Sequence, residues 1–213
     1  MMIYKSISTQ TLQRLPMYLN YLKSLPDNQI LNISATTIAE ALKFNDVQVR
    51  KDLAIISSGG RPKIGYITKN LIFDIEKFLG YDDADSAVIA GAGDLGRTLL
   101  SYDGFSKYGL DIIAAFDVRE DIIGTTINGK KVLSSDKLKD LCGRMKVRIG
   151  IIAVPASEAQ EICNSMVESG ILAIWNFAPV NLNVPDSVLV QNEDMAFSLA
   201  KLSKSLSKKL CLN

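Results

Sequence analysis

The chain has 213 residues, of which 47% are hydrophobic, and its 24 Lys and Arg nearly balance its 23 Asp and Glu, as in a globular protein of one or two domains. It contains no histidine, which excludes Ser-His-Asp and Cys-His catalysis and histidine metal sites, although a Tyr or Lys remains available as a proton donor. No apolar run approaches the roughly 20 residues that cross a bilayer, and the first residues lack a secretory signal, so we expect a cytoplasmic protein without a membrane partner.

The cysteines and the distribution of charge narrow the function classes further. Cys142, Cys163 and Cys211 lack the spacing of metal ligands, so we expect buried side chains and no metal site. Residues 1–80 hold ten Lys or Arg against six Asp or Glu, whereas the remainder holds fourteen against seventeen. The front of the chain is therefore basic, and the rest is mildly acidic.

Apolar periodicity predicts three helices in the first part of the chain. The first spans Thr9–Leu25 and either bends or begins at Pro16. Ser34 is the predicted N-cap of a short second helix, and Asp46 is that of a third helix over Val47–Ser57. Two short helices across a tight turn form a helix-turn-helix, for which an ordinary helical hairpin is the alternative.

The stretch from Gly59 to Tyr66, which follows the third helix, is predicted to form a glycine-rich, basic hairpin, and a hairpin in this place is a wing. The third helix carries polar side chains near its start, where a recognition helix meets base edges and phosphates. The predicted DNA contacts are Ser34, Gln48, Arg50, Lys51, Arg61, Lys63 and Tyr66. Basic side chains that only solvate a surface are the alternative. A helix ending at Gly80 closes this predicted winged helix domain, residues 1–80.

The next predicted domain, residues 81–192, opens with an apolar run that leads into the hexad Gly91-Ala92-Gly93-Asp94-Leu95-Gly96. A strand, a glycine turn and a helix in this order hold the pyrophosphate of a dinucleotide. The first glycine allows a tight turn, the second lets the backbone approach the phosphates, and the third lets the helix pack on the strand. An ordinary glycine-rich turn is the alternative.

A second predicted strand ends in Asp117, which lies 21 residues beyond Gly96. A carboxylate at that strand end accepts hydrogen bonds from the ribose of NAD and repels the 2'-phosphate of NADP, although Arg119 leaves this choice partly open. An Asp that merely starts a turn is the alternative. Together with the hexad, Asp117 predicts an NAD(H) site.

The remaining segments alternate between strands and helices, which predicts an α/β fold with a doubly wound parallel sheet of the Rossmann type. The predicted strands are 131–133, 147–154, 171–177 and 188–190, and the predicted helices are 135–142 and 157–169. Ligands lie at the carboxyl ends of such strands. The predicted cofactor site therefore extends to Val154, Pro155, Ala156, Asn176, Phe177, Ala178 and Pro179. A final amphipathic helix over Asp194–Leu210, within residues 193–213, packs either on its own domain or against a partner chain.

Several motifs in register resemble one family over nearly the whole chain. They are Arg14–Pro16, Gln48–Leu53, Gly91–Gly96, Ala115–Asp117, Val154–Ala156, Asn176–Pro179 and Asp194. In these motifs the chain is similar to the bacterial redox-sensing transcriptional repressor Rex, a winged helix joined to an NAD(H)-binding Rossmann domain.

This resemblance implies a homodimer that exchanges its C-terminal helices between subunits and binds promoter double-stranded DNA. NADH is expected to favour a closed form that cannot span the operator, whereas NAD+ or the empty state permits DNA binding. The family's contact between domains corresponds here to Arg14, Tyr102 and Asp194, for which surface pairing of Arg14 is the alternative.

The sequence departs from the family's pattern between Ala54 and Lys63. Where the family continues with Ser-Tyr-Phe-Gly and a Phe-Gly-Lys-Arg-Gly wing, this chain has Ala-Ile-Ile-Ser-Ser-Gly-Gly-Arg-Pro-Lys. Two basic groups remain, so attraction to phosphates persists, whereas the side chains that would contact bases or the minor groove differ from the family's. The chain therefore resembles a divergent member or a paralogue.

We expect a redox-sensing transcriptional repressor, not an enzyme, that leaves promoter DNA when NADH binds. One alternative is a small NAD-dependent oxidoreductase with a helical N-terminal extension. Another is a paralogue that has lost DNA binding.

Overall fold

The computed structural model describes residues 7–26, 31–81 and 85–210, and the chain divides into two compact units. The winged unit comprises residues 1–83, and the sheet unit comprises residues 84–213, including the last helix. Within the described ranges, no helix combines the length and the apolar character that a membrane crossing needs.

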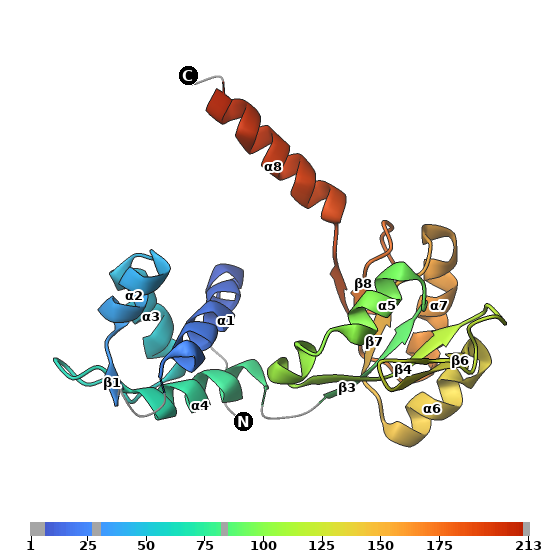
Figure 1. Cartoon of the computed structure of the whole chain (residues 1–213), viewed down its shortest axis with the longest axis horizontal. Coiled ribbons are helices and arrows are strands. Elements are labelled where there is room, and N and C mark those ends of the chain that lie inside the picture. The colour runs from blue at the N-terminus through green and yellow to red at the C-terminus, as the bar shows by residue number, and fades with distance from the viewer. Residues whose placement is uncertain (1–6, 27–30, 82–84, 211–213) are drawn as a thin grey trace. The chain divides into compact units, whose positions relative to one another are not determined.

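Four helices and a two-stranded sheet build the described part of the winged unit (Figure 1). The helices are α1 (Thr9–Ser24), α2 (Ala35–Leu42), α3 (Asp46–Ile56) and α4 (Thr68–Leu79), and the antiparallel strands are β1 (Asn32–Ile33) and β2 (Tyr66–Ile67). Their apolar faces meet in one core, whose fully buried side chains include Leu15, Leu19, Ile38, Leu53 and Leu71. This arrangement confirms the predicted N-terminal helix-turn-helix.

Serine caps fix the start of α1 and of α2. The Oγ of Ser8 accepts a hydrogen bond from the Thr11 amide at 3.1 Å, and the Oγ of Ser34 accepts one from the Thr37 amide at 3.0 Å. The Ser34 cap is therefore confirmed. Helix α1 begins before Pro16 and continues through it, so the alternative that this helix starts at Pro16 is wrong.

The predicted cap of α3 is wrong by one residue. The Oδ1 of Asn45 accepts hydrogen bonds from the amides of Val47 at 3.0 Å and Gln48 at 3.3 Å. Asn45 therefore satisfies the first free amides of the helix, and Asp46 becomes its first helical residue. From there the Asp46 carboxylate pairs with Arg50 at 3.4 Å.

The predicted wing is a loop with one bridge and not a regular hairpin. Residues Arg61 and Gly65 form an isolated antiparallel bridge around Lys63, whose φ is 67°. The strand that follows, β2, pairs instead with β1. The sequence did not predict β1 because two residues are too few to show a periodic pattern.

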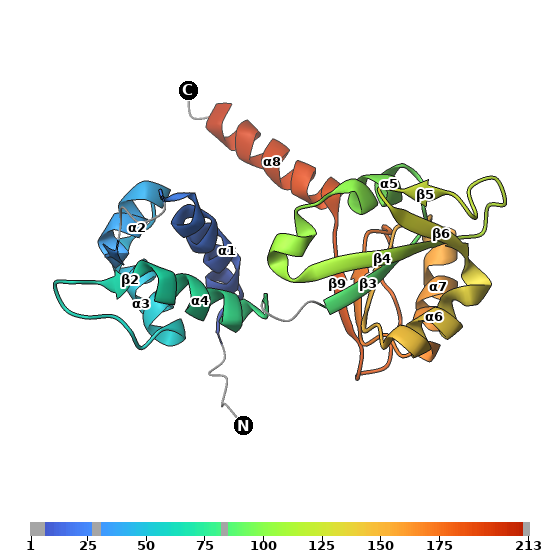
Figure 2. The same ribbon diagram turned by 60° about the horizontal axis from the view of Figure 1, so that its bottom comes forward.

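The described residues of the sheet unit form a seven-stranded sheet in the order β5-β6-β4-β3-β7-β8-β9 (Figure 2). The strands are β3 (Asp85–Ala90), β4 (Leu110–Asp117), β5 (Thr126–Ile127), β6 (Lys130–Ser134), β7 (Ile149–Ile152), β8 (Ala173–Asn176) and β9 (Leu189–Asn192). All pairings are parallel except that of β5 with β6. Without the short β5 this is the Rossmann strand order, which confirms the predicted doubly wound sheet.

Helices cover both faces of this sheet (Figure 2). They are α5 (Asp94–Ser101), α6 (Leu138–Met145) and α7 (Ala156–Glu168), and 3-10 turns lie at Phe105–Tyr108 and Ser135–Lys137. The last helix, α8 (Met195–Leu210), does not cover the sheet and extends away from it (Figure 2). On β3, Ala87 and Ile89 share a core with Leu100 of α5, whereas Val88 and Ala90 share the opposite core with α6 and α7. This alternation is what two-sided burial of a parallel strand requires.

Two further expectations are resolved in this unit. Strand β7 is shorter than the predicted strand 147–154, because the Val147 amide closes α6 by donating to the Cys142 carbonyl at 3.1 Å. Cys142 and Cys163 are buried free thiols, as predicted. Cys211 lies outside the described residues.

Candidate functional site

The glycine hexad forms the turn between β3 and α5. Gly91 has a φ of 94°, and a Cβ there would overlap the Ala153 carbonyl. A Cβ at Gly96 would overlap the Gly91 carbonyl, so neighbouring backbone excludes larger residues at both positions. A Cβ at Gly93 would meet nothing within 4 Å. The protein's own packing therefore does not require glycine at Gly93, and the open space there fits a phosphate at the start of α5.

The strand-end carboxylate of Asp117 is tied to this turn. It is 8% exposed, and its Oδ2 accepts a hydrogen bond from the Ala92 amide at 2.8 Å. Its Oδ1 accepts from the amide and the Nε of Arg119 at 2.9 and 3.3 Å. Burial opposes the charged form, but these donors outweigh it and hold the pKa of Asp117 below its ordinary value. Asp117 thus does more than start a turn.

A cavity of about 530 Å³ opens beside these residues, at the carboxyl ends of β3, β4 and β7. Five of the predicted cofactor residues line it: Gly91, Gly93, Asp117, Val154 and Pro155. Other side chains that line the cavity were not among the predicted cofactor residues. They include Val118, Arg119, Ser135, Glu158, Glu161, Ile162 and Ser165. Most of these lie on α7, whose polar residues look like any solvated helix face until the fold brings them to the strand ends.

The other predicted residues of the hexad and of α7 lie next to the cavity. Ala92 is buried and holds Asp117, whereas Asp94 is exposed in the first turn of α5. Leu95 and Gly96 belong to α5, and Ala156 is the first residue of α7. Their predicted contact with a cofactor stays a prediction.

The predicted loop after β8 does not line the cavity. Asn176 is fully buried, and its Oδ1 accepts from the Ala178 amide at 3.0 Å. Its Nδ2 donates to the Val180 carbonyl at 2.9 Å and to Asn192 Oδ1 at 2.8 Å. Asn176 therefore shapes the loop that carries Ala178 and the exposed Pro179, and a contact of this loop with nicotinamide stays a prediction.

A row of aromatic rings runs from this loop to the end of α5. The ring centroids of Phe177 and Trp175 lie 4.7 Å apart, those of Trp175 and Phe105 5.7 Å, and those of Phe105 and Tyr102 4.9 Å. Trp175 Nε1 also donates to Glu193 Oε1 at 2.9 Å. These contacts join residues far apart in the sequence, which no local pattern could predict.

In the winged unit, five of the seven predicted DNA contacts are exposed. Gln48, Arg50 and Lys51 are exposed on α3, and Arg61 and Lys63 are exposed in the loop that follows. Ser34 caps α2, and Tyr66 is only 8% exposed within the core. The contact of all seven residues with DNA stays a prediction.

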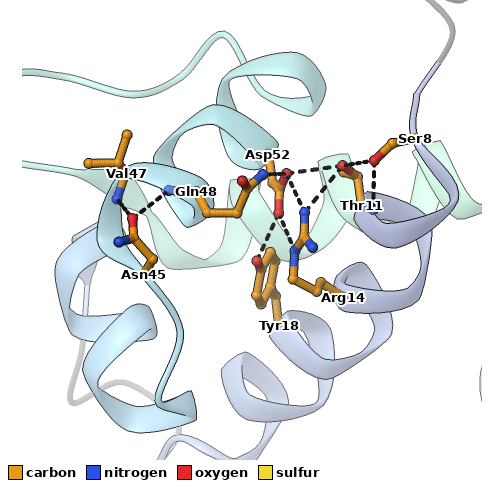
Figure 3. A network of polar contacts seen from close by, with 8 residues as sticks. All are labelled: Ser8, Thr11, Arg14, Tyr18, Asn45, Val47, Gln48 and Asp52. Carbon is orange, nitrogen blue, oxygen red and sulfur yellow. Dashed lines mark hydrogen bonds and ion pairs between the residues drawn. The ribbon is translucent and has the colours of Figure 1, made fainter.

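A network of polar contacts joins α1 to α3 around Asp52, which is 1% exposed (Figure 3). Arg14 donates through Nε to Oδ2 at 2.7 Å and through Nη2 to Oδ1 at 3.0 Å. The hydroxyls of Thr11 and Tyr18 donate at 3.1 and 2.9 Å, and Gln48 Nε2 donates at 2.9 Å. Burial raises the pKa of Asp52, but the hydrogen bonds outweigh it and hold that pKa below its ordinary value.

The three residues of the predicted contact between domains lie in different units. Arg14 belongs to the winged unit, where it pairs with Asp52 and is 18% exposed. Tyr102 is exposed in the sheet unit, and Asp194 accepts a hydrogen bond from the Phe197 amide at 2.7 Å at the start of α8. Their joint role stays a prediction.

Two family models and several solved structures match this chain. Residues 6–54 match the family model of a putative DNA-binding protein N-terminus, and residues 82–180 match that of a CoA binding domain. The solved structure of RSP in complex with beta-NAD+ and operator DNA has a TM-score of 0.90 and 32% identity, with 98% of this chain and 96% of that chain covered. The structure of RSP with beta-NADH has a TM-score of 0.84 and 32% identity, and 98% of each chain is covered.

Curated relatives extend over nearly the full chain. The redox-sensing transcriptional repressor Rex of Treponema denticola is 43% identical over 199 residues, which cover 93% of this chain and 95% of the relative. Its namesake from Porphyromonas gingivalis is 40% identical over 190 residues, which cover 89% and 87%. This chain therefore belongs to the Rex family of redox-sensing transcriptional repressors.

Proposed function

We propose that the protein is a cytoplasmic repressor that binds promoter DNA through the winged unit and leaves it when the sheet unit binds NADH. One observation carries this proposal. The chain combines a recognition helix with exposed Gln48, Arg50 and Lys51 and a Rossmann sheet whose cavity is bounded by Gly93 and Asp117. The redox state of the bound nicotinamide is the signal, and no substrate needs to react.

The charges around the cavity favour NAD(H) over NADP(H). Asp117, Glu158 and Glu161 line it, whereas the lining cation Arg119 is paired with Asp117 at 3.3 Å. A 2'-phosphate would meet this excess of negative charge, but a ribose hydroxyl could donate to Asp117. Beside it, Val118 is 68% exposed and offers an apolar surface to an adenine ring.

Helix α8 supports a homodimer. Its side chains Leu199, Leu202, Leu206 and Leu210 are 55–67% exposed along one stripe, and Phe197 is 67% exposed away from that stripe. An isolated helix of this length is only marginally stable in water, so we expect its apolar side chains to pack against another surface. A second copy of the chain supplies it when the two copies exchange their helices.

In this proposal, Arg14, Tyr102 and Asp194 couple the nucleotide to the DNA-binding surface. A charge-assisted bond between a guanidinium and a carboxylate is directional, so making or breaking it favours one orientation of two domains over another. Arg50 and Lys51 of α3, with Arg61 and Lys63 of the wing, contact phosphates, whereas Gln48 lies at the base edges.

The test is a titration of NADH into the protein bound to a duplex obtained by selection from random DNA. We expect NADH to release the duplex and equal concentrations of NAD+ to leave most of it bound. Unchanged DNA affinity at saturating NADH would refute the proposal. Steady turnover of NADH with carbonyl substrates would instead favour the oxidoreductase.

A further inference from the structure

On the recognition helix α3, the direction of one polar side chain is fixed by the protein itself. Gln48 is exposed, and its Nε2 donates to Asp52 Oδ1 at 2.9 Å (Figure 3). Asp52 is 1% exposed, and Arg14 and Tyr18 also donate to it. Asp52 is therefore held in place from α1 and provides a rigid acceptor for Gln48.

The chemistry of this contact determines which way the amide of Gln48 faces. An ionised carboxylate can only accept hydrogen bonds, so the amide nitrogen, and not the oxygen, must face Asp52. The pair with Arg14 keeps Asp52 ionised. The flipped amide would place its oxygen against the carboxylate, two acceptors facing each other in a partly buried contact, which is costly. Oε1 and the second N–H of Gln48 are therefore the groups left for another partner.

The position of Gln48 suits a base contact. It is the third residue of α3, and the first turns of a recognition helix are those that meet base edges. An adenine offers an N6 donor and an N7 acceptor in the major groove, which match a glutamine oxygen and N–H. Arg50 is restrained less, since its ion pair is with Asp46 at the exposed surface, at 3.4 Å.

We propose that Gln48 reads one adenine in each operator half-site, with Oε1 accepting from N6 and Nε2 donating to N7, and that Asp52 is its positioning residue. This inference rests on the proposed binding of operator DNA. It makes Gln48 a determinant of sequence specificity, whereas the exposed cations of α3 and the wing supply attraction to any sequence. Because Arg14 holds the same carboxylate, the readout also depends on α1.

The test compares wild-type protein with Gln48→Ala on a selected duplex and on duplexes altered at one base pair at a time. Wild-type protein should prefer adenine at one half-site position by roughly 5- to 150-fold, the range of a good bidentate pair. Gln48→Ala should lose most of that preference and keep its preferences elsewhere. Lys51→Ala, on the same helix, is the matched control and should weaken all duplexes by a similar factor.

A second probe removes only the atom in question. A duplex with 7-deazaadenine at that position lacks N7, so it should bind wild-type protein more weakly and Gln48→Ala no more weakly than the unmodified duplex does. Asp52→Asn tests the positioning role. The carboxamide of the new asparagine can face Gln48 with either its oxygen or its N–H, so it no longer fixes the orientation of the Gln48 amide. Discrimination at the adenine position should therefore fall more than discrimination at any other position. This pattern of discrimination separates positioning from general support, because loss of structure weakens every position alike.

Two results overturn the inference in different ways. Equal weakening of all duplexes by Gln48→Ala, with equal effects of 7-deazaadenine on both proteins, refutes adenine readout and leaves the repressor intact. Wild-type protein that binds no duplex more tightly than random DNA refutes operator binding itself, and the inference falls with it. Since Gln48 is exposed, Gln48→Ala folds even where Asp52→Asn does not, so the adenine test stands without the second variant.

Discussion

The carboxylate of Asp117 accepts the amide hydrogen of Ala92 at 2.8 Å, so the end of β4 is tied to the glycine turn that follows β3. A residue predicted to face a ribose also holds the loop predicted to face the phosphates. Arg119 donates to the same carboxylate and is thereby kept from acting as a free cation beside the cavity. In the proposed function, both the choice of cofactor and the geometry of the glycine turn therefore depend on the side chain of Asp117.

We predict that Asp117→Ala weakens NADH binding about 10- to 100-fold, because it removes a charged acceptor and releases the Ala92 amide. It should also narrow the gap between NADH and NADPH, since Arg119 becomes available to a 2'-phosphate. Both affinities follow from quenching of Trp175, the single tryptophan of the chain, by energy transfer to the bound cofactor. Asp121→Ala, exposed in the loop after β4, is the control. Unchanged affinities for both nucleotides would reject the role.

The glycines of the hexad should respond differently to alanine. Gly93→Ala places its Cβ in open space, so the free protein should lose no more than about 0.5 kcal/mol of stability while its NADH affinity falls at least tenfold. Gly91→Ala and Gly96→Ala should unfold or strongly destabilise the sheet unit, because their Cβ atoms would overlap backbone carbonyls. Thermal unfolding and NADH titration separate the two cases. Normal NADH affinity in Gly93→Ala would contradict a phosphate at this turn.

Alkaline pH should weaken the winged unit through Tyr18. Burial and the hydrogen bond to Asp52 raise the pKa of Tyr18 to about 12, from about 10 in the unfolded chain. A raised pKa means that the stabilisation is complete below about pH 10 and disappears as the pH rises through about 12. Wild-type protein should therefore exceed Tyr18→Phe in stability by about 1.5 to 3 kcal/mol at pH 8, and the gap should close toward pH 12.

Denaturant unfolding followed by circular dichroism measures this gap, and Trp175 fluorescence reports the sheet unit separately. Tyr21→Phe, which removes a hydroxyl from the same helix, controls for the loss of a phenol. A gap between wild type and Tyr18→Phe that stays constant from pH 8 to pH 12 would contradict the account.

Helix α8 should decide the oligomeric state. Leu202→Asp with Leu206→Asp places two charges on the exposed apolar stripe, so we expect the dimer to dissociate and operator affinity to fall at least tenfold, because two half-sites are no longer held together. Ser205→Asp adds a charge on the same helix away from the stripe and should leave the dimer intact. Light scattering gives the mass directly. Dimers of the doubly substituted protein at micromolar concentration would show that α8 is not the interface.

The fold follows from the sequence wherever a periodic pattern is long enough. The apolar spacing of helix α1 and the apolar runs of strands β3 and β4 predict these elements to within a few residues. The β1 and β5 strands have two residues each and depend on a partner strand, so no local signal exists for them. The predicted N-cap of α3 is wrong by one residue, because Asn and Asp are both favourable N-caps and only the geometry of the helix selects Asn45 over Asp46.

Site residues could be predicted where they form a motif in the sequence, and could not be predicted where the fold brings them together. The spacing of Gly91, Gly93 and Asp117 in the sequence predicts that they belong to one site, and in the structure they line one cavity. Glu158 and Glu161 reach the same cavity only because α7 packs across the strand ends. Asp52 belongs to the motif that suggested DNA binding, but its burial under α1 gives it a supporting role that the pattern does not reveal.

The most direct test of a repressor that senses NADH is to measure its affinity for NADH with and without operator DNA. Energy transfer from Trp175 to the bound NADH reports the binding. Coupling between two sites is reciprocal, so the factor by which NADH lowers the affinity for DNA equals the factor by which DNA lowers the affinity for NADH. We predict that saturating operator raises the Kd for NADH about 5- to 150-fold, and that random DNA does not. Equal Kd values in the two conditions would contradict the account, because a ligand with no preference between two states cannot shift them.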